Sequence, residues 1–118
     1  MRHARLAIAL LAVPAFACAL PVDERAAREF RHTLQPGAVA EECVRLEAGR
    51  SRAFEWTSDA ALDFNIHYHA GDKVSYPVKL GNQKKGRGKF TASTSQDYCW
   101  MWSAKFPTEL TGKLGPEE

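Results

Sequence analysis

The chain has 118 residues, with 16 Lys and Arg against 14 Asp and Glu, which gives a formal net charge of +2. Two of the arginines lie within the first five residues, so the rest of the chain is neutral. A protein that binds nucleic acid usually has a net basic footprint, so this balance argues against a nucleic-acid partner. The length suffices for one small domain.

The N-terminal segment has the pattern of an export signal. Its charged start is followed by an apolar run over residues 6–13, which is too short to span a bilayer. The small residues that follow allow cleavage before Leu20, cleavage before Cys18, or lipidation of Cys18. We expect residues 1–19 to be a signal peptide and the mature chain to be periplasmic or secreted. A lipoprotein anchored through Cys18 is the alternative, and no second apolar run is long enough for a transmembrane segment.

The three cysteines divide unequally along the chain. Cleavage before Leu20 or lipidation removes Cys18 from the pairing problem, whereas cleavage before Cys18 leaves its thiol unpaired. Cys43 and Cys99 then remain as partners in an oxidising compartment. The sequence therefore predicts one Cys43–Cys99 disulfide, which the chain-entropy model values at roughly 4 kcal/mol for a loop of this length.

Residues 20–40 differ in pattern from the remainder. Asp23 to Gln35 mixes charged with apolar residues in a way that suits a short helix of about three turns, and Pro36-Gly37 would end it. A frayed arm is the competing interpretation. We expect an N-terminal arm or short helix over 20–40 and a single domain over 41–118.

From Glu41 onward, apolar and polar residues alternate with a period of two, which is typical of strands. The expected strands are Glu42–Leu46, Ser51–Thr57, Leu62–His69, Lys73–Lys79, Lys89–Ser95, Tyr98–Ser103 and Glu109–Leu114. Gly, Asn, Asp and Pro residues separate them as turn signals. About seven short strands with such frequent turns favour an all-β fold, a small antiparallel β-sandwich.

Four spaced elements stand out in the β region, namely Glu42-Cys43, Asp63-Phe64-Asn65-Ile66, Gly88-Lys89-Phe90-Thr91 and Tyr98-Cys99-Trp100-Met101-Trp102. Together they resemble the GOLD (Golgi dynamics) domain, the jelly-roll-like lumenal β-sandwich of eukaryotic cargo receptors, over residues 41–114. The resemblance implies that Cys43 and Cys99 match the disulfide partners of that family. It also implies a binding module rather than an enzyme. The coiled coil and transmembrane helix of the cargo receptors have no counterpart here, so their trafficking role is not implied.

His67 and His69 form a pair that could bind a metal ion. On a strand, their imidazoles share a face about 7 Å apart, and Asp63 and Asn65 share that face and could supply oxygen. Imidazole suits zinc and copper. His67, His69 and Asp63 are therefore a candidate metal site, and ordinary histidines on a polar strand are the alternative.

Five cations gather around glycines in the segment 79–89: Lys79, Lys84, Lys85, Arg87 and Lys89. We expect a Gly-rich hairpin there that suits an acidic protein, a lipid headgroup or a phosphorylated glycan. A solvated loop is the alternative. Trp100 and Trp102 could stack on a ligand from an exposed sheet face, or they could fill the core.

Catalytic patterns do not stand out in the sequence. The serines lie outside any Gly-x-Ser-x-Gly turn, and the carboxylate pair Glu41-Glu42 has no evident apolar pocket. We therefore expect no enzymatic activity and no cofactor. The sequence predicts an exported binding module for an unknown protein, lipid headgroup or glycan. The alternative is a small zinc- or copper-binding envelope protein that uses His67 and His69.

Overall fold

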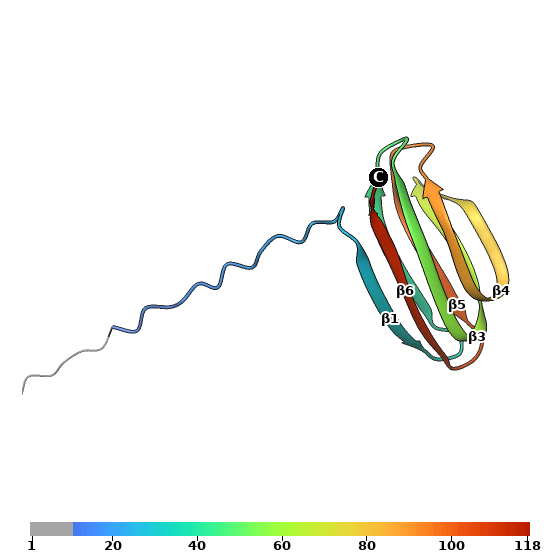
Figure 1. Ribbon diagram of the computed structural model, residues 1–118, viewed down its shortest axis with the longest axis horizontal. Coiled ribbons are helices and arrows are strands. Elements are labelled where there is room, and N and C mark those ends of the chain that lie inside the picture. The colour runs from blue at the N-terminus through green and yellow to red at the C-terminus, as the bar shows by residue number, and fades with distance from the viewer. Residues whose placement is uncertain (1–10) are drawn as a thin grey trace, which may run out of the picture.

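A computed structural model describes residues 11–118, in which an extended N-terminal segment leads into a β domain (Figure 1). The predicted charged start of the leader, with Arg2 and Arg5, lies outside the described residues. Within residues 11–22 the large apolar side chains are exposed, and Leu11 and Phe16 are each 91% exposed. This segment therefore contributes nothing to the core of the domain.

The domain consists of six strands that pair antiparallel. Their bounds are Arg28–Leu34 (β1), Val39–Leu46 (β2), Ser51–Ala70 (β3), Lys73–Thr91 (β4), Gln96–Ala104 (β5) and Thr108–Glu117 (β6). The strand order is β1-β6-β3-β5-β2, and β4 pairs with β3. The predicted antiparallel all-β fold is confirmed. Residues 11–118 contain no helix with the length and apolarity needed to cross a membrane.

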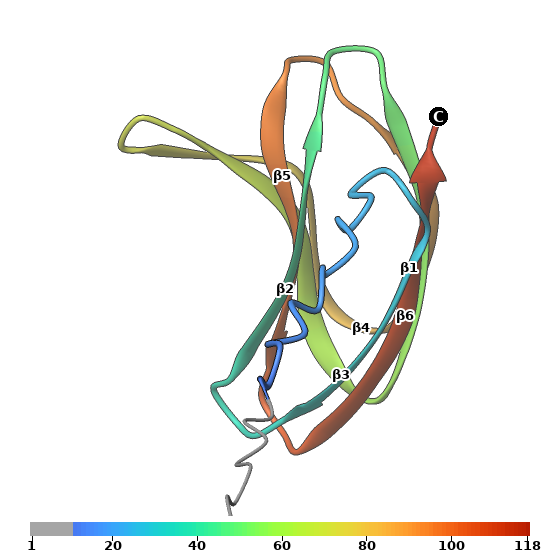
Figure 2. The same cartoon turned by 90° about the vertical axis from the view of Figure 1, so that its left-hand side faces the viewer.

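Strands β3 and β4 form one long ribbon that belongs to both layers of the sandwich. β3 pairs with β6 over residues 52–58 and with β5 over residues 62–67. Between these ranges the pairing with β4 changes register, and Asn82 of β4 adopts a left-handed φ of 57°. The bend sets β1 and β6 opposite β2 and β5 as two curved layers (Figure 2).

The sequence predicted separate strands where the structure has single bent ones. Residues 51–57 and 62–69 both belong to β3, and β4 contains the strand predicted over 73–79 together with residues 89–91 of the strand predicted over 89–95. The intervening turn signals, Ser58-Asp59 and Gly81-Asn82, bend the ribbon and do not reverse it. Asp59 Oδ1 accepts a hydrogen bond from the Glu109 backbone N–H at 2.9 Å, which ties the bend to β6.

Strand β1 occupies the segment for which a helix or arm was expected. Phe30, His32 and Leu34 turn toward the core, while the residues between them are exposed. This alternation has the period of a strand, and β1 pairs with β6 along its whole length. The helical alternative is wrong because pairing with an available sheet edge outweighs a weak local helix preference.

The core between the layers is aromatic. Trp100 and Trp102 are 0% and 1% exposed. The ring centroid of Trp102 lies 5.5 Å from that of Phe64 and 6.2 Å from that of Trp56. Aromatic pairs at such separations add about 0.5–1.5 kcal/mol beyond their buried area. The interpretation that Trp100 and Trp102 fill the core is confirmed, and their placement on a ligand-binding surface is wrong, because both rings are enclosed.

Two glycines make room for the aromatic rings of Trp56 and Phe30. Gly86 and Gly112 lie on either side of Trp56 in the pairing register. A Cβ at Gly86 would lie 2.3 Å from Trp56 Nε1, and a Cβ at Gly112 would lie 2.3 Å from Phe30 Cζ. No real Cβ tolerates such contacts. The two rings therefore occupy the space that a Cβ atom would fill at any residue other than glycine.

The predicted disulfide is confirmed on the outer surface. Cys43 of β2 and Cys99 of β5 are directly opposed in register, with an S–S distance of 2.03 Å and a Cα–Cα distance of 4.1 Å. The short Cα separation is typical of a non-hydrogen-bonded antiparallel pair. Cys18 is exposed and free.

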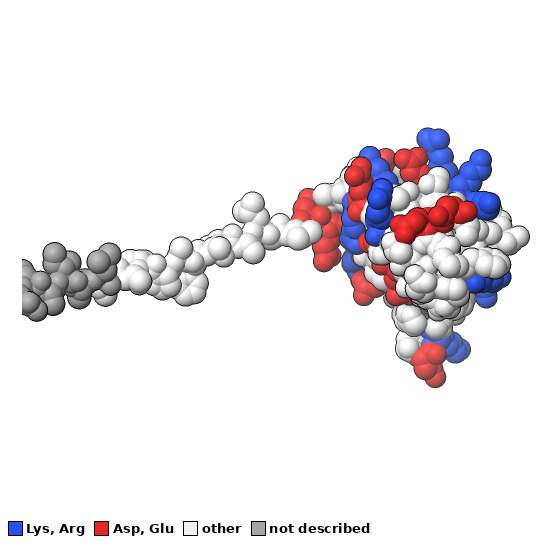
Figure 3. All heavy atoms as spheres, turned by 90° about the horizontal axis from the view of Figure 1, so that it is seen from below, with Lys and Arg blue, Asp and Glu red and all other residues white. Residues whose placement is uncertain are grey.

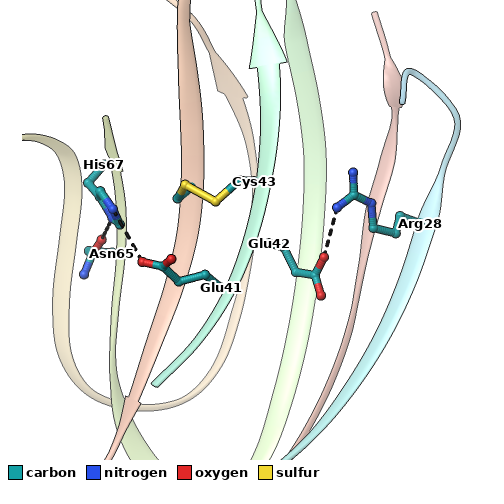
Figure 4. The surroundings of a disulfide bond; sticks show 7 residues. Arg28, Glu41, Glu42, Cys43, Asn65 and His67 are labelled. Atoms are coloured by element: carbon teal, nitrogen blue, oxygen red, sulfur yellow. Dashed lines mark hydrogen bonds and ion pairs between the residues drawn. A yellow bond between two sulfur atoms is a disulfide. The ribbon is translucent and has the colours of Figure 1, made fainter. Parts of the chain in front are cut away.

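Glu42 joins the two layers at the edge where β1 faces β2. Its Oε2 accepts a hydrogen bond from Arg28 Nη1 at 3.0 Å (Figure 4). Its Oε1 lies 3.0 Å from His32 Nε2. The Glu42 side chain is 13% exposed. Partial burial strengthens such a charge-assisted contact relative to one at the open surface.

Arg52 holds the start of the domain against its end. It is 1% exposed, and its Nη1 donates to the carbonyls of Ala26 at 2.9 Å and Gly115 at 2.8 Å. Its Nη2 donates to the carbonyl of Glu24. Carbonyl oxygens satisfy both terminal nitrogens of this guanidinium, while its buried Nε has no hydrogen-bond partner among residues 11–118. The contacts of the two terminal nitrogens fix the chain onto the domain from Glu24 onward.

We expect Cys43→Ala to lower the free energy of unfolding by about 2–5 kcal/mol, as loss of a native disulfide usually does in a small exported domain. Denaturant unfolding with and without reductant measures the effect. In the full chain, Cys18→Ser is the matched control and should leave the midpoint unchanged. Equal midpoints with and without reductant would contradict the prediction.

Gly86→Ala should destabilise the domain by about 1–3 kcal/mol, because the added methyl group must displace the packed Trp56 ring. Gly115→Ala is a matched control, since a Cβ there would meet Ala53 Cβ at an ordinary 3.4 Å. That control should change stability by less than about 0.5 kcal/mol. Urea unfolding of both variants provides the comparison, and equal losses would count against the close approach at Gly86.

Candidate functional site

The outer face of the layer formed by β1, β6, the first half of β3 and the second half of β4 carries a hollow of about 960 Å³. We call it the hollow face. Its outward side chains form two rows across the four strands, Glu29–Lys113–Glu55–Arg87 and Arg31–Thr111–Thr57–Lys85. Strand alternation explains the rows, because the intervening Phe30 and Trp56 turn toward the core.

The first row alternates in sign. In register, Glu55 lies between Lys113 and Arg87, and its Oε2 is 4.0 Å from Arg87 Nε. Opposite charges on adjacent strands attract weakly at an exposed surface. Acidic and basic side chains are likewise interspersed over the surface seen in Figure 3. This row is therefore largely self-neutralising.

The second row has hydroxyls at its centre and cations at its ends. Thr57 Oγ1 and Thr111 Oγ1 are 3.3 Å apart. Arg31 and Lys85, which flank them, form no ion pair among residues 11–118. Four adjacent strands place these two cations about 14 Å apart at their backbones. The row thus offers a set of donors wide enough for several acceptor groups of one partner.

The segment 79–89 is not a hairpin. It is the bend and second half of β4, which pairs with β3 alone and is an edge of the sheet. Only part of the predicted cationic cluster is brought together. Lys85 and Arg87 line the hollow face. Lys84 lies between them and the bend, and strand alternation turns it to the opposite side.

The two outermost members of that cluster have other neighbours. Lys89 Nζ is 2.6 Å from a carboxylate oxygen of the C-terminal Glu118. Lys79 lies on the part of β4 that belongs to the other layer, and its Nζ is 4.7 Å from the centroid of the Tyr76 ring. The five cations therefore do not form a single anion-binding loop.

Asp63 does not join the two histidines. Its Oδ1 accepts a hydrogen bond from the Asn82 backbone N–H at 3.0 Å, and its Oδ2 lies 3.3 Å from Lys105 Nζ. The Asn82 amide, and after it Lys105, lower the pKa of Asp63. The carboxylate is therefore engaged at the bend of the ribbon, and its predicted role beside His67 and His69 is not supported.

His67 has the expected Asn65 and His69 as neighbours, and also Glu41, which the sequence did not indicate. Although it lies on an outer face, it is 4% exposed. Its Nδ1 is 2.8 Å from Asn65 Oδ1, and its Nε2 is 3.6 Å from Glu41 Oε1 of β2 (Figure 4). The ring centroids of His67 and His69 are 5.2 Å apart. Burial lowers the pKa of His67 and outweighs the opposing effect of Glu41.

A group of three potential metal ligands within residues 11–118 has atoms within 4.8 Å of one another, namely Glu41, Cys43 and Cys99. Both sulfurs belong to the disulfide. Since a metal ligand must be a thiolate, the cysteines cannot serve in this oxidised state. Of the three residues, only Glu41 can therefore bind a metal ion while the disulfide is intact.

Sequence reasoning missed most of the hollow face. It did not single out Glu29, Arg31, Glu55 or Lys113. Glu55 and Lys113 lie within strands that the sequence predicts, so their outward positions on those strands were the available signal. Glu29 and Arg31 could not be found in this way, because their segment was expected to be a helix or an arm.

Comparison with known proteins finds structural likeness only. No protein-family model and no curated protein matches the chain. Among solved structures, the periplasmic inhibitor of g-type lysozyme PliG from Aeromonas hydrophila superposes with a TM-score of 0.50 at 11% identity, over 76% of this chain and 87% of PliG. A de novo designed double-stranded β-helix superposes with a TM-score of 0.39 at 22% identity, over 77% of this chain and 99% of that design. At such identities the likeness to PliG concerns the fold alone.

Proposed function

We propose that this chain is an exported, non-catalytic binding module that uses the hollow face to bind another protein. The observation that carries the proposal is the outward donor row of Arg31, Thr111, Thr57 and Lys85 above a hollow of about 960 Å³. The outer-surface disulfide supports export, because such bonds persist in oxidising compartments. The apolar N-terminal leader supports it as well.

The chemistry of the hollow face favours a protein over a lipid or a glycan. Its outward side chains carry both charge signs in a fixed alternation, which suits a surface of complementary pattern. An acyl chain would need an apolar lining. A sugar ring would need an exposed aromatic platform, and Trp100 and Trp102 are buried.

Two likenesses agree with this class of function. PliG is, by its description, a periplasmic lysozyme inhibitor, so its fold serves the binding of a protein in an oxidising compartment. The resemblance to the GOLD domain, which remains a proposal, also implies a binding module. A g-type lysozyme is therefore the first partner to test.

The double variant Arg31→Ser/Lys85→Ser should weaken partner binding at least about tenfold, because both unpaired cations of the donor row are lost. Its thermal midpoint should hardly change, since both side chains are exposed. Lys79→Ser/Lys84→Ser is the matched control, which removes the same charge away from the hollow face. Biolayer interferometry against g-type lysozyme, and capture from the exported fraction of the producing cells, are the measurements.

Binding by the control but not by the hollow-face variant is the expected outcome. Equal binding by both variants would move the site away from this face. The wild type could fail to bind g-type lysozyme and yet capture another protein in a way that depends on Arg31 and Lys85. That result would identify a different partner and would support the hollow face as the binding site. Turnover of a captured molecule would overturn the non-catalytic assignment.

A further inference from the structure

We propose that His67, His69 and Glu41 form a binding site for a divalent transition-metal ion of the kind that imidazole prefers, zinc or copper(II). We call these three residues the imidazole–carboxylate site. It lies on the outer face of the layer formed by β2, β5 and the second half of β3, beside the disulfide (Figure 4). The hollow face belongs to the opposite layer, so this proposal does not depend on the proposed protein-binding function.

The position of the proton on His67 carries the argument. Its Nδ1 is 2.8 Å from Asn65 Oδ1, and an amide oxygen only accepts. Nδ1 therefore donates, and in the neutral imidazole Nε2 presents a lone pair. Metal-binding histidines characteristically donate their other ring N–H to such an oxygen, which fixes the tautomer and the ring orientation. Asn65 is itself 8% exposed, so this orienting contact is shielded from water.

The lone pair of His67 points toward a carboxylate. His67 Nε2 and Glu41 Oε1 are 3.6 Å apart, and both are acceptors when the imidazole is neutral. Two acceptors that converge are stabilised by a cation between them. A divalent metal ion satisfies both atoms without protonating the ring.

His69 is the proposed third ligand, and its ring must turn to complete the set, because His67, His69 and Glu41 do not bring their ligand atoms within 4.8 Å of one another in the structure. Strand alternation places it on the same face as His67, and the two ring centroids are 5.2 Å apart at an interplanar angle of 81°. His69 is exposed, so its ring is free to turn toward a metal ion. Two imidazoles, one carboxylate and a water make a four-coordinate set of the kind that zinc accepts.

The neighbouring cation does not neutralise Glu41 in advance. Lys79 is the cross-strand neighbour of Asn65 on this face, and its Nζ lies 4.7 Å from the centroid of the Tyr76 ring. Among residues 11–118, the ion-pair partner of Glu41 is His67. The carboxylate charge is therefore available to a metal ion.

Calorimetric titration of the purified, oxidised protein with zinc chloride and with copper(II) chloride near neutral pH tests the site. Reductant must be absent, because reduced Cys43 and Cys99 would add thiolate ligands within 4.8 Å of Glu41. We expect a micromolar dissociation constant for at least one metal. Glu41→Gln and His69→Gln should each raise it at least about tenfold, since each removes one ligand from an exposed position.

His32→Gln is the matched control, because His32 also lies beside a glutamate, with its Nε2 3.0 Å from Glu42 Oε1. It should leave metal affinity within about twofold of the wild type. Nuclear magnetic resonance of the zinc form should shift the ring signals of His67 and His69 and leave those of His32 in place. Arg31→Ser/Lys85→Ser should bind zinc as the wild type does, which separates this test from that of the hollow face.

Three results would overturn the proposal. The first is the absence of binding at millimolar metal. The second is equal affinity in wild type, Glu41→Gln and His69→Gln, which would mean adventitious binding elsewhere. The third is a His67 ring that responds to acid but not to zinc, which would make the contact with Glu41 a proton-linked ion pair only.

Discussion

The structure depends on one ribbon that must serve two layers. β3 pairs with β4 along its length and with β6 and then β5 on its other edge. The bend lies where the pairing passes from β6 to β5, so each half of β3 keeps backbone hydrogen-bond partners on both edges. The aromatic core follows from this geometry, since Trp56 before the bend and Phe64 after it face one another with centroids 5.3 Å apart. The two outer faces follow as well, because each layer then has one covered side and one free side.

The core and the outer faces are linked through the glycines. Gly86 and Gly112 admit the rings of Trp56 and Phe30 from inside, and both also line the hollow from outside. Strand positions without a Cβ allow a sheet to bend locally. The shape of the hollow face is therefore set by the packing beneath it as well as by the charged side chains that line it. In β2, strand alternation turns the neighbouring residues Glu41 and Glu42 to opposite sides of the layer. Glu41 contacts His67 on the outer face, and Glu42 contacts β1 on the inner side.

Local features of the fold could be predicted from the sequence, but contacts between residues on different strands could not. Alternation was sufficient to predict the strands and the shared face of His67 and His69, and cysteine counting was sufficient for the disulfide. Turn residues could not distinguish a bend in a long ribbon from a reversal, so Asn82 was read as a turn between two strands. The place of Glu41 beside His67 depends on register between β2, β5 and β3, which no local pattern encodes, whereas alternation alone places Asn65 on the face of His67. The hollow face was missed for the same reason, because its rows run across strands that are far apart in the chain.

The buried guanidinium of Arg52 has a mechanical consequence for the N-terminal end. Since it fixes the carbonyl of Glu24, the chain is free to extend only before that residue. The stretch from Cys18 to Glu24 reaches at most about 20 Å when fully extended. The end of the domain beside it is a hollow of mixed charge, lined by residues that include Asp23, Arg45 and Arg50. An attachment at Cys18 would therefore keep this end of the domain within about 20 Å of the attached surface.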